Sequence, residues 1–445
     1  MNTRQKNLID QYNQPGNLLV VTNYPPRGEG VHTAAIGGVA GFAKNTLLPL
    51  SRHYNKEDKQ IIVLAEILDK AGAYEEDGML IVRCWNRNSV ILYWQLAKQC
   101  LTFSRVNDVL IEFEFASYGD FFTTSVFPIF LFFLRLMGKR ISLVLHQVVT
   151  DLWSLTGHIG LTDQNFIFNM FSVLLPLFYG FLTHLASCTI VLERMFRKRL
   201  RGLAPMDRVS VIPHGVETQK NLTSKATSRK HLGLANKDFV VLSFGFITWY
   251  KGTDLLVQAL RNTKTIAGKR LRLMIAGGPS TSQKHKRHYQ TFYERVMHLI
   301  GKSNHITVTG FVPQTELADY FAACDVVVFP YRTVMSSSGP LSLALSYHKP
   351  IVLSRSMKDY FYTSDVQLAM NKTKVSKSLL FMPQDWSKLP SQLEKVSIAA
   401  NQNRLKHFSM VIAQKRSFTS IAADYYTILT KPNSAHTLSL RPAFA

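Results

Sequence analysis

The chain has 445 residues, 46% of them apolar and 18% charged, a globular composition that is too long for one hydrophobic core and fits two or three domains. Its formal net charge of +23 indicates an anionic partner: nucleic acid, a negatively charged membrane surface or a phosphorylated substrate. No nucleic-acid-reading motif and no zinc-ligand spacing accompany the charge, so nucleic acid is not the expected partner.

The N-terminal residues and the cysteines indicate the cellular compartment of the protein. Residues 1–16 contain no apolar signal region, and the four cysteines are scattered along the chain instead of forming a disulfide pattern. Both features predict a cytoplasmic protein with reduced thiols.

The first half of the chain alternates strand-like and helix-like patterns. An apolar run at residues 17–22 is bounded by Pro and Gly turns and predicts a buried parallel strand. Strands that alternate with helices predict a doubly wound parallel sheet, here an N-terminal Rossmann-like domain over residues 1–216. The further predicted strands of this domain are 60–65, 79–84, 108–115, 141–146, 187–192 and 208–212.

Candidate functional residues lie beside the predicted strand ends of this domain. Gly37 and Gly38, between a strand and a helix, either let a ligand approach the backbone or form a plain tight turn. Glu114 is a candidate ligand-binding group or base, although Glu112 shares its strand face and one of the two can be structural. His146 is a candidate hydrogen-bonding or polarising group, or else a structural histidine.

Two apolar segments interrupt the alternation. Residues 126–137 and 166–182 are strongly apolar but shorter than the roughly 20 residues of a membrane-spanning helix. We expect the first to be a buried core helix. The second fits a core helix and a membrane-surface helix equally well, because the basic cluster at 194–201 follows it and would suit anionic lipid headgroups.

A polar stretch at 217–238 predicts an interdomain linker, after which the alternation restarts. The restart predicts a second doubly wound domain at 239–408, whose strand ends face those of the first domain across a cleft. An amphipathic pattern predicts a last helix at 409–430, followed by a tail at 431–445. The predicted strands of the second domain are 239–244, 271–276, 305–309, 325–330, 350–354 and 379–382.

The start of the second domain carries the pattern on which the functional hypothesis rests. Its first strand leads through Gly245 and a short loop containing Lys251 into a helix that begins near Asp254. A strand that feeds a helix through a glycine turn leaves backbone N–H groups free, and a lysine beside them favours a phosphate or diphosphate. The alternative is an ordinary turn with a solvated lysine.

A later loop holds a second candidate anion seat. The N–H groups of Ser338, Gly339 and the helix opened by Leu341 would add to the diphosphate site. Ser337 and Pro340 belong to the same candidate donor-binding turn. The alternative is a flexible polar turn with a helix cap.

These features together resemble the family-4 glycosyltransferases, which have a two-Rossmann-domain architecture called GT-B. In the first half, three segments are similar to elements of that family: VLIEFEFASYGDF, LVLHQV and VSVIPHGVE. Near the end of the chain, RSFTSIAADYYTIL resembles the family's terminal helix, which crosses back onto the first domain. The resemblance covers nearly the whole chain. In the second half it is carried, in the family's order, by FGFITWYKGTDLLVQAL, RLMIAGGP, ITVTGFVPQTELADYFAACDVVVFPY and SSSGPLSLALSYHKPIVLS.

The chain departs from the family pattern at the donor site. The arginine that usually follows the donor-loop glycine is replaced by uncharged residues at 246–248, which leaves Lys251 as the cation of this loop. The family's paired glutamates would fall near Met335 and Leu343, and neither is acidic. A variant branch carries a similar SG-x-L-x-L-A sequence at this place.

The resemblance implies a glycosyltransferase that moves a sugar from a nucleoside-diphosphate-sugar donor to a lipid-linked or saccharide acceptor. On this reading Gly37 and Gly38 would contact the sugar or acceptor, Glu114 would be an acceptor ligand or base, and His146 would bind the sugar or polarise the acceptor. The resemblance also implies retention of the anomeric configuration and no cofactor, and the lack of an Asp-x-Asp cluster at a strand end predicts a metal-independent reaction. The expected location is the cytoplasm, peripheral on the inner face of a membrane whose anionic surface is a further partner. The alternative is a non-catalytic relative that serves as a binding partner or scaffold, because the usual arginine and glutamates are missing.

Overall fold

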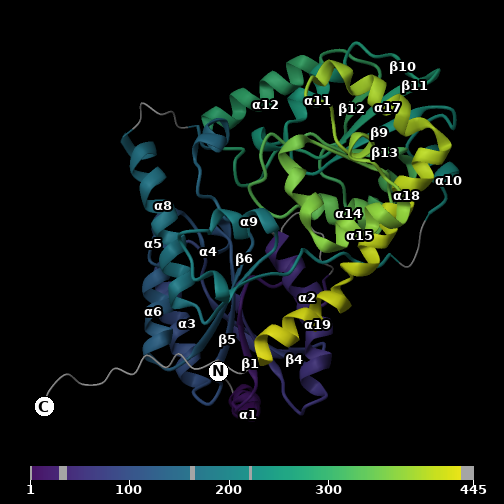
Figure 1. Cartoon of the computed structure of the whole chain (residues 1–445). Helices are drawn as coiled ribbons and strands as arrows, with labels where there is room; N and C mark the ends of the chain where they lie inside the picture. The colour runs from purple at the N-terminus through teal and green to yellow at the C-terminus, as the bar shows by residue number, and fades with distance from the viewer. Residues whose placement is uncertain (1–2, 30–37, 161–165, 220–222, 432–445) are drawn as a thin grey trace, which may run out of the picture.

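The computed structural model describes residues 3–29, 38–160, 166–219 and 223–431. In these residues the chain forms two α/β domains, with the first below the second in Figure 1. Each domain has a central, mainly parallel sheet covered by helices, so the predicted pair of doubly wound domains is confirmed.

The first domain contains an eight-stranded sheet of order β3-β4-β2-β1-β5-β6-β7-β8. All neighbours are parallel except β3, which is antiparallel to β4. Strand β3 was not predicted, because its sequence GAYEE is polar and half-exposed and gives no apolar run. The strands are β1 (Leu18–Val21), β2 (Ile61–Glu66), β3 (Gly72–Glu76), β4 (Met79–Trp85), β5 (Asp108–Phe113), β6 (Arg140–Leu145), β7 (Cys188–Val191) and β8 (Val209–Val211).

Helices cover both faces of this sheet. On one face α2 (Gly38–Asn55) and α19 (Phe418–Thr430) share a core with the even-numbered side chains of β5 and β6, such as Leu110 and Val144. On the other face α3 (Ile91–Thr102), α6 (Phe127–Leu136) and α8 (Phe166–Leu185) pack against the odd-numbered ones. Shorter helices are α1 (Thr3–Tyr12), α4 (Phe115–Tyr118), α5 (Phe121–Ser125), α7 (Thr156–Ile159) and α9 (Arg194–Arg199).

The second domain contains a sheet of order β10-β11-β9-β13-β14, with β12 paired to β11. Its strands are β9 (Phe239–Phe244), β10 (Thr265–Ile266), β11 (Lys269–Ala276), β12 (Ile306–Val308), β13 (Val326–Phe329) and β14 (Ile351–Leu353). Its helices are α10 (Lys225–His231), α11 (Thr253–Leu260), α12 (Arg287–Ile300), α13 (Leu317–Ala323), α14 (Gly339–Ser346), α15 (Ser364–Thr373), α16 (Lys377–Leu380), α17 (Leu389–Ser397) and α18 (Ala399–Lys415).

The strand predicted at 379–382 is wrong. This stretch begins as the end of the short helix α16, and in it Phe381 makes an isolated bridge to Leu353. The hydroxyl of Ser376 accepts a hydrogen bond from the N–H of Leu379 at 3.3 Å, and this cap favours a helical turn over an extended strand.

Residues 126–137 were expected to form a buried core helix. The helix is present, but the prediction that it is buried is wrong. Helix α6 buries Phe127, Phe130, Leu131 and Leu134, but its opposite stripe is solvent-exposed. The helix is apolar on all sides, and such a sequence does not show which side the sheet covers. The exposed stripe consists of Ile129, Phe132, Phe133 and Leu136.

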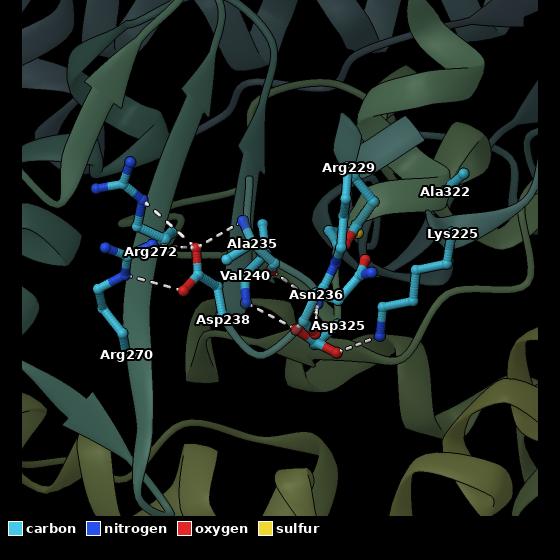
Figure 2. Close-up of polar contacts among 12 residues, drawn as sticks. Lys225, Arg229, Ala235, Asn236, Asp238, Val240, Arg270, Arg272, Ala322 and Asp325 are labelled. Carbon is cyan, nitrogen blue, oxygen red and sulfur yellow. Dashed lines mark hydrogen bonds and ion pairs between the residues drawn. The ribbon is translucent and has the colours of Figure 1, made fainter. Parts of the chain in front are cut away.

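The stretch at 217–238 is more than a linker, because it contains α10, which packs against α13 of the second domain. Figure 2 shows the polar contacts that fix it. Asp325 accepts a hydrogen bond at 2.7 Å from both the Arg229 guanidinium and the N–H of Val240, and it also pairs with Lys225. Arg229 is 2% exposed, so a strong bond to Asp325 compensates the burial of its charge. The sequence pattern is polar because the segment contributes these buried ionic contacts.

The chain passes between the domains twice, at neighbouring places. The outgoing segment contains Gly215 and Val216, and the returning segment contains Arg416 and Ser417. The N–H of Val216 donates to the carbonyl of Arg416 at 2.6 Å. A side chain at Gly215 would lie 2.4 Å from the ring of Phe418, so only glycine fits this contact. After the second crossing, α19 packs against α2 of the first domain.

We predict that Asp325→Ala lowers the free energy of unfolding by about 3–5 kcal/mol, because it leaves the Arg229 charge buried without its partner. Chemical denaturation measures this loss. The matched control is Lys225→Met, which removes the partner that is 45% exposed and should cost at most about 1 kcal/mol. Equal losses in the two variants would contradict the assignment of Arg229–Asp325 as the pair that holds α10.

Candidate functional site

A cleft of about 900 Å³ lies between the carboxyl edges of the two sheets. Both domains line it, which agrees with the prediction that ligands bind where the strand ends face each other. Gly37 lies outside the described residues, and Leu341 is buried behind the cleft wall. The other predicted site residues line the cleft: Gly38, Glu114 and His146 from the first domain, and Gly245, Lys251, Ser337, Ser338, Gly339 and Pro340 from the second.

The donor loop places Lys251 directly over Gly245. Gly245 has a φ of +106°, and a side chain there would come within 2.7 Å of the Lys251 Nζ and 3.0 Å of Pro340. A side chain at Gly277 would lie 2.1 Å from the carbonyl oxygen of Gly245. These glycines therefore allow three backbone segments and one ammonium group to meet at a single point.

An ionic contact behind the loop fixes the position of Lys251. Asp254, at the start of α11 and 1% exposed, accepts two hydrogen bonds from Arg332, at 2.7 and 2.6 Å. Arg332 also donates to the carbonyl of Trp249 at 2.7 Å, and its guanidinium lies 5.0 Å from the centre of the Trp249 ring. Bidentate pairing holds both side chains in one geometry, so the loop is built before any ligand arrives.

Burial lowers the pKa of Lys251 to about 8. Desolvation disfavours the charged form of an amine, and burial is the cause of this shift. Lys251 is therefore a cation at neutral pH that would gain from an anionic ligand.

The turn before α14 differs from the predicted anion seat. Pro340 has no N–H, and the N–H of Leu341 donates to the hydroxyl of Ser338 at 3.2 Å. The helix begins at Gly339, not at Leu341, so Gly339 brings its N–H to the helix start. A side chain at Gly339 would have no neighbour within 4 Å, which shows open space in front of this residue. The turn therefore offers fewer free N–H groups than the sequence suggested, and its role as an anion seat stays a prediction.

Ser337 connects the two domains. Its hydroxyl donates to Glu193 at 2.6 Å, and its N–H donates to the carbonyl of His146 at 3.2 Å. Tyr360 donates to the same carboxylate at 2.7 Å. Burial raises the pKa of Glu193, and Arg416 and these two hydrogen bonds oppose the shift. In this structure the Ser337 side chain is thus engaged in a contact between domains.

His146 lies beside two carboxylates at the acceptor side of the cleft. Its Nε2 is 3.4 Å from Glu112, and among the described residues this nitrogen has no hydrogen-bond partner. The other carboxylate is Glu114, whose pKa is raised by burial and lowered in part by His146 and Arg87. Glu112 is fully buried and accepts a hydrogen bond from Thr22 at 3.0 Å. Glu112 therefore positions the histidine, while Glu114 lines the cleft.

Sequence reasoning missed several residues that line the cleft. Lys286 brings a second cation to the second-domain side of the cleft. Arg87 and His158 come from the first domain, and Tyr250 and Tyr331 from the second. Lys286 follows the RLMIAGGP strand, whose predicted end points toward the cleft, and this position was the available signal. Among the described residues no group of three or more His, Cys, Asp or Glu side chains forms a metal-binding cluster.

Comparison with known proteins places the strongest sequence similarity in the second domain. Residues 224–358 match the family model of glycosyl transferases group 1. The chain is 32% identical over 139 residues to a D-inositol 3-phosphate glycosyltransferase of Xylanimonas cellulosilytica, covering 30% of this chain and 31% of that protein. It is 33% identical over 112 residues to a GDP-mannose:glycolipid 4-beta-D-mannosyltransferase of Xanthomonas campestris, covering 25% and 29%. The chain thus spans about a third of the length of these relatives.

Solved structures match over nearly the whole chain. Sucrose-phosphate synthase from Thermosynechococcus elongatus aligns with a TM-score of 0.62 and 16% identity over 93% of this chain and 98% of that one. Anabaena HepE in complex with UDP-glucose aligns with a TM-score of 0.62 and 14% identity over 93% and 99%. These likenesses confirm the predicted GT-B fold.

We predict that Lys251 titrates with a midpoint near pH 8, because burial lowers its pKa to about 8. The amine is charged below this pH and neutral above it. The ¹³Cε shift of Lys251 in lysine-labelled protein, assigned by its absence in Lys251→Arg, measures the midpoint. A midpoint of 10 or higher would show that water reaches this amine freely.

Proposed function

We propose that the chain is a family-4-type glycosyltransferase that moves a sugar from a nucleoside-diphosphate-sugar donor to a lipid-linked or saccharide acceptor. The observation that carries the proposal is the position of Lys251 over Gly245, inside the segment that matches the glycosyl transferases group 1 model. The printed names of relatives support it, since one acts with GDP-mannose on a glycolipid and HepE binds UDP-glucose. The proposed location is the cytoplasm.

The second domain would bind the diphosphate of the donor. Lys251 offers a desolvated positive charge, and electrostatic stabilisation of the leaving group is strongest where water is excluded. Lys286 lines the same cleft and would share this task. Gly245 and Gly277 let the backbone segments pack closely enough to hold Lys251 at this point. These residues replace the arginine that the chain lacks, and the reaction is proposed to be metal-independent.

The first domain would position the acceptor. The acceptor oxygen forms a bond to the anomeric carbon while the bond from that carbon to the diphosphate breaks, and the diphosphate leaves with the electron pair. Glu114, whose pKa is raised by burial, would take the acceptor proton as the base. His146 would hydrogen-bond the sugar or the acceptor, held in place by Glu112. Retention of the anomeric configuration is part of the proposal, so the acceptor oxygen would attack from the same face of the sugar that the diphosphate leaves.

A second candidate function is a non-catalytic nucleotide-binding partner or scaffold. One specific observation favours it: the positions of the family's paired glutamates carry Met335, which joins an apolar cluster, and Leu343, which is 8% exposed. Neither side chain can hydrogen-bond a sugar or ribose hydroxyl. This candidate predicts binding of a nucleotide sugar without its consumption.

A panel of UDP-, GDP-, ADP- and dTDP-sugars tests the function. We expect release of nucleoside diphosphate from one donor, increased by a lipid extract or saccharide acceptor. Lys251→Ala should lower kcat/KM on the order of 10²-fold, because a preorganised charge at the leaving group is lost. The matched control is Lys264→Ala, an exposed lysine of the same domain. Binding of a donor without release under any condition would favour the non-catalytic alternative.

We also predict that Glu114→Gln lowers kcat by at least about tenfold and leaves the Kd of the nucleoside diphosphate unchanged, because it removes a base but keeps the size of the side chain. Turnover assays and calorimetric titration measure the two quantities. Asp120→Asn, at an exposed carboxylate of the same domain, is the control. A weakened diphosphate Kd in Glu114→Gln would place this residue in the donor site instead.

A further inference from the structure

The first domain has one strongly apolar outer surface. Four neighbouring helices, α3, α5, α6 and α8, form it, and they lie together at the side of the domain in Figure 1. In each of the three longer helices the exposed apolar residues recur at helical spacing and form a stripe. This surface, here called the apolar face, consists of Ile91, Trp94, Leu101, Phe121, Phe122, Ile129, Phe132, Phe133, Leu136, Phe166, Met170, Val173, Leu174, Leu177 and Phe181.

The amount of exposed apolar side chain on this face is unusual for a soluble surface. Trp94 and Phe122 are each 70% exposed, and Phe166 is 79% exposed. Scattered exposed apolar residues are normal, but contiguous patches of this kind mark a binding surface. The face therefore has a partner that covers it.

The charges around the face suit an anionic surface. The four helices contain Lys98 and Arg135 but no Asp or Glu. Arg201 is exposed and belongs to a turn that lies against α8, where the carbonyl of Leu203 comes within 3.3 Å of the Cβ position at Gly180. The exposed Asp120, which caps α5, lies at the edge of the face beside Phe121. An apolar surface whose helices carry basic and no acidic residues is complementary to a bilayer that contains anionic lipids.

Helix α8 is held on the domain. Residues 168–185 are long and apolar enough to cross a membrane by composition alone. However, Phe168, Tyr179 and Leu182 are fully buried against the domain. The Tyr179 hydroxyl also accepts from the N–H of Val149 and donates to the carbonyl of Gln147, both at 3.2 Å. These contacts fix α8 with its exposed stripe outward, as in a helix that lies on a membrane.

An apolar path connects the face to the cleft. Val149, Leu152, Leu155 and Phe168 form a separate cluster, which Phe171 and Leu175 of α8 join from one side. Tyr250 and Met335 join the same cluster from the donor side. Phe171 also contacts Phe121 of the apolar face, with ring centres 4.4 Å apart. Hydrocarbon can thus contact apolar side chains from the outer surface to the donor loop.

We propose that the apolar face docks on a bilayer containing anionic phospholipid and that the acceptor is an amphiphile whose hydrocarbon part follows this apolar path. The second half of this statement rests on the proposed glycosyl transfer, because it names the acceptor class of that site. The docking itself does not depend on catalysis.

Flotation with vesicles tests the docking. We expect the full chain to float with vesicles of phosphatidylcholine and phosphatidylglycerol (7:3), to float less with phosphatidylcholine alone, and to be released in part by 1 M salt. The variant Phe122→Ser/Phe132→Ser/Leu177→Ser/Phe181→Ser should lower the bound fraction at least about tenfold. None of these four residues lines the cleft.

The matched control changes four exposed apolar residues elsewhere: Leu68→Ser, Met297→Ser, Leu368→Ser and Ile398→Ser. It should float like the unchanged chain, and circular dichroism checks the fold of both variants. Absence of flotation at low salt, equal loss in the control, or a dimer in solution that only the face variant dissociates would overturn the docking.

The acceptor class is tested with the same variants. With a lipid extract in vesicles, the face variant should lose the lipid-dependent increase in diphosphate release while its Kd for the nucleoside diphosphate stays unchanged. An increase that persists in the face variant, or that a water-soluble saccharide alone produces, would overturn the lipid acceptor. Flotation without donor binding or release would instead overturn the proposed transferase and leave the docking standing.

Discussion

One backbone contact holds the two halves of the cleft together. Gln147 forms a bridge with Ser336, and the N–H of Ser337 donates to the carbonyl of His146 at 3.2 Å. His146 follows β6 of the first sheet, and Ser336 lies in the loop after β13 of the second. Because both segments come from strand carboxyl ends, the contact places the acceptor-side histidine next to the donor-side turn. The buried carboxylate of Glu193 strengthens this junction through the Ser337 hydroxyl.

Hydrogen bonds hold the loop that carries Lys251, the buried lysine of the proposed donor site. The position usually held by arginine is occupied by the segment 246–248, and the backbone of Ile247 bonds to the carbonyl of Gly278 at 2.9 Å and to the Tyr289 hydroxyl at 2.7 Å. The segment that lacks the usual arginine is thus held in place by backbone hydrogen bonds. A side chain that is already held in place loses little conformational entropy when a ligand binds. One well-placed amine can therefore substitute for two more mobile cationic side chains.

The sequence predicted the sheets well and the surfaces poorly. Apolar runs such as 239–244 coincide with buried strands because both faces of a parallel strand are covered. The same reasoning predicted the burial of α6 wrongly, because the sequence of an all-apolar helix does not show which side is exposed to solvent. It also missed β3, which is polar, and the cap at Ser376 that turns 377–380 into a helix.

The site was predicted where it depends on local spacing and not where it depends on the docking of the domains. Gly245 and Lys251 are six residues apart, and their contact follows from one turn. The pairing of Ser337 with Glu193 joins residues 144 positions apart in the sequence, and no local pattern reveals it. The same holds for Lys286, whose place in the cleft is set by the packing of α12.

The double crossing between the domains has a mechanical consequence. Val216 and Arg416 are hydrogen-bonded at the two crossings, so the domains are joined by two adjacent backbone segments, an arrangement that could serve as a hinge. A hinge of this kind permits rotation about one axis and resists sliding of one domain over the other. Away from the crossings, the domains also meet where His288 bonds to the carbonyl of His158 at 3.1 Å and where the N–H of Ser337 donates to the carbonyl of His146. A rotation that widens the cleft must therefore break both of these contacts, while the hydrogen bond at the crossings can stay in place.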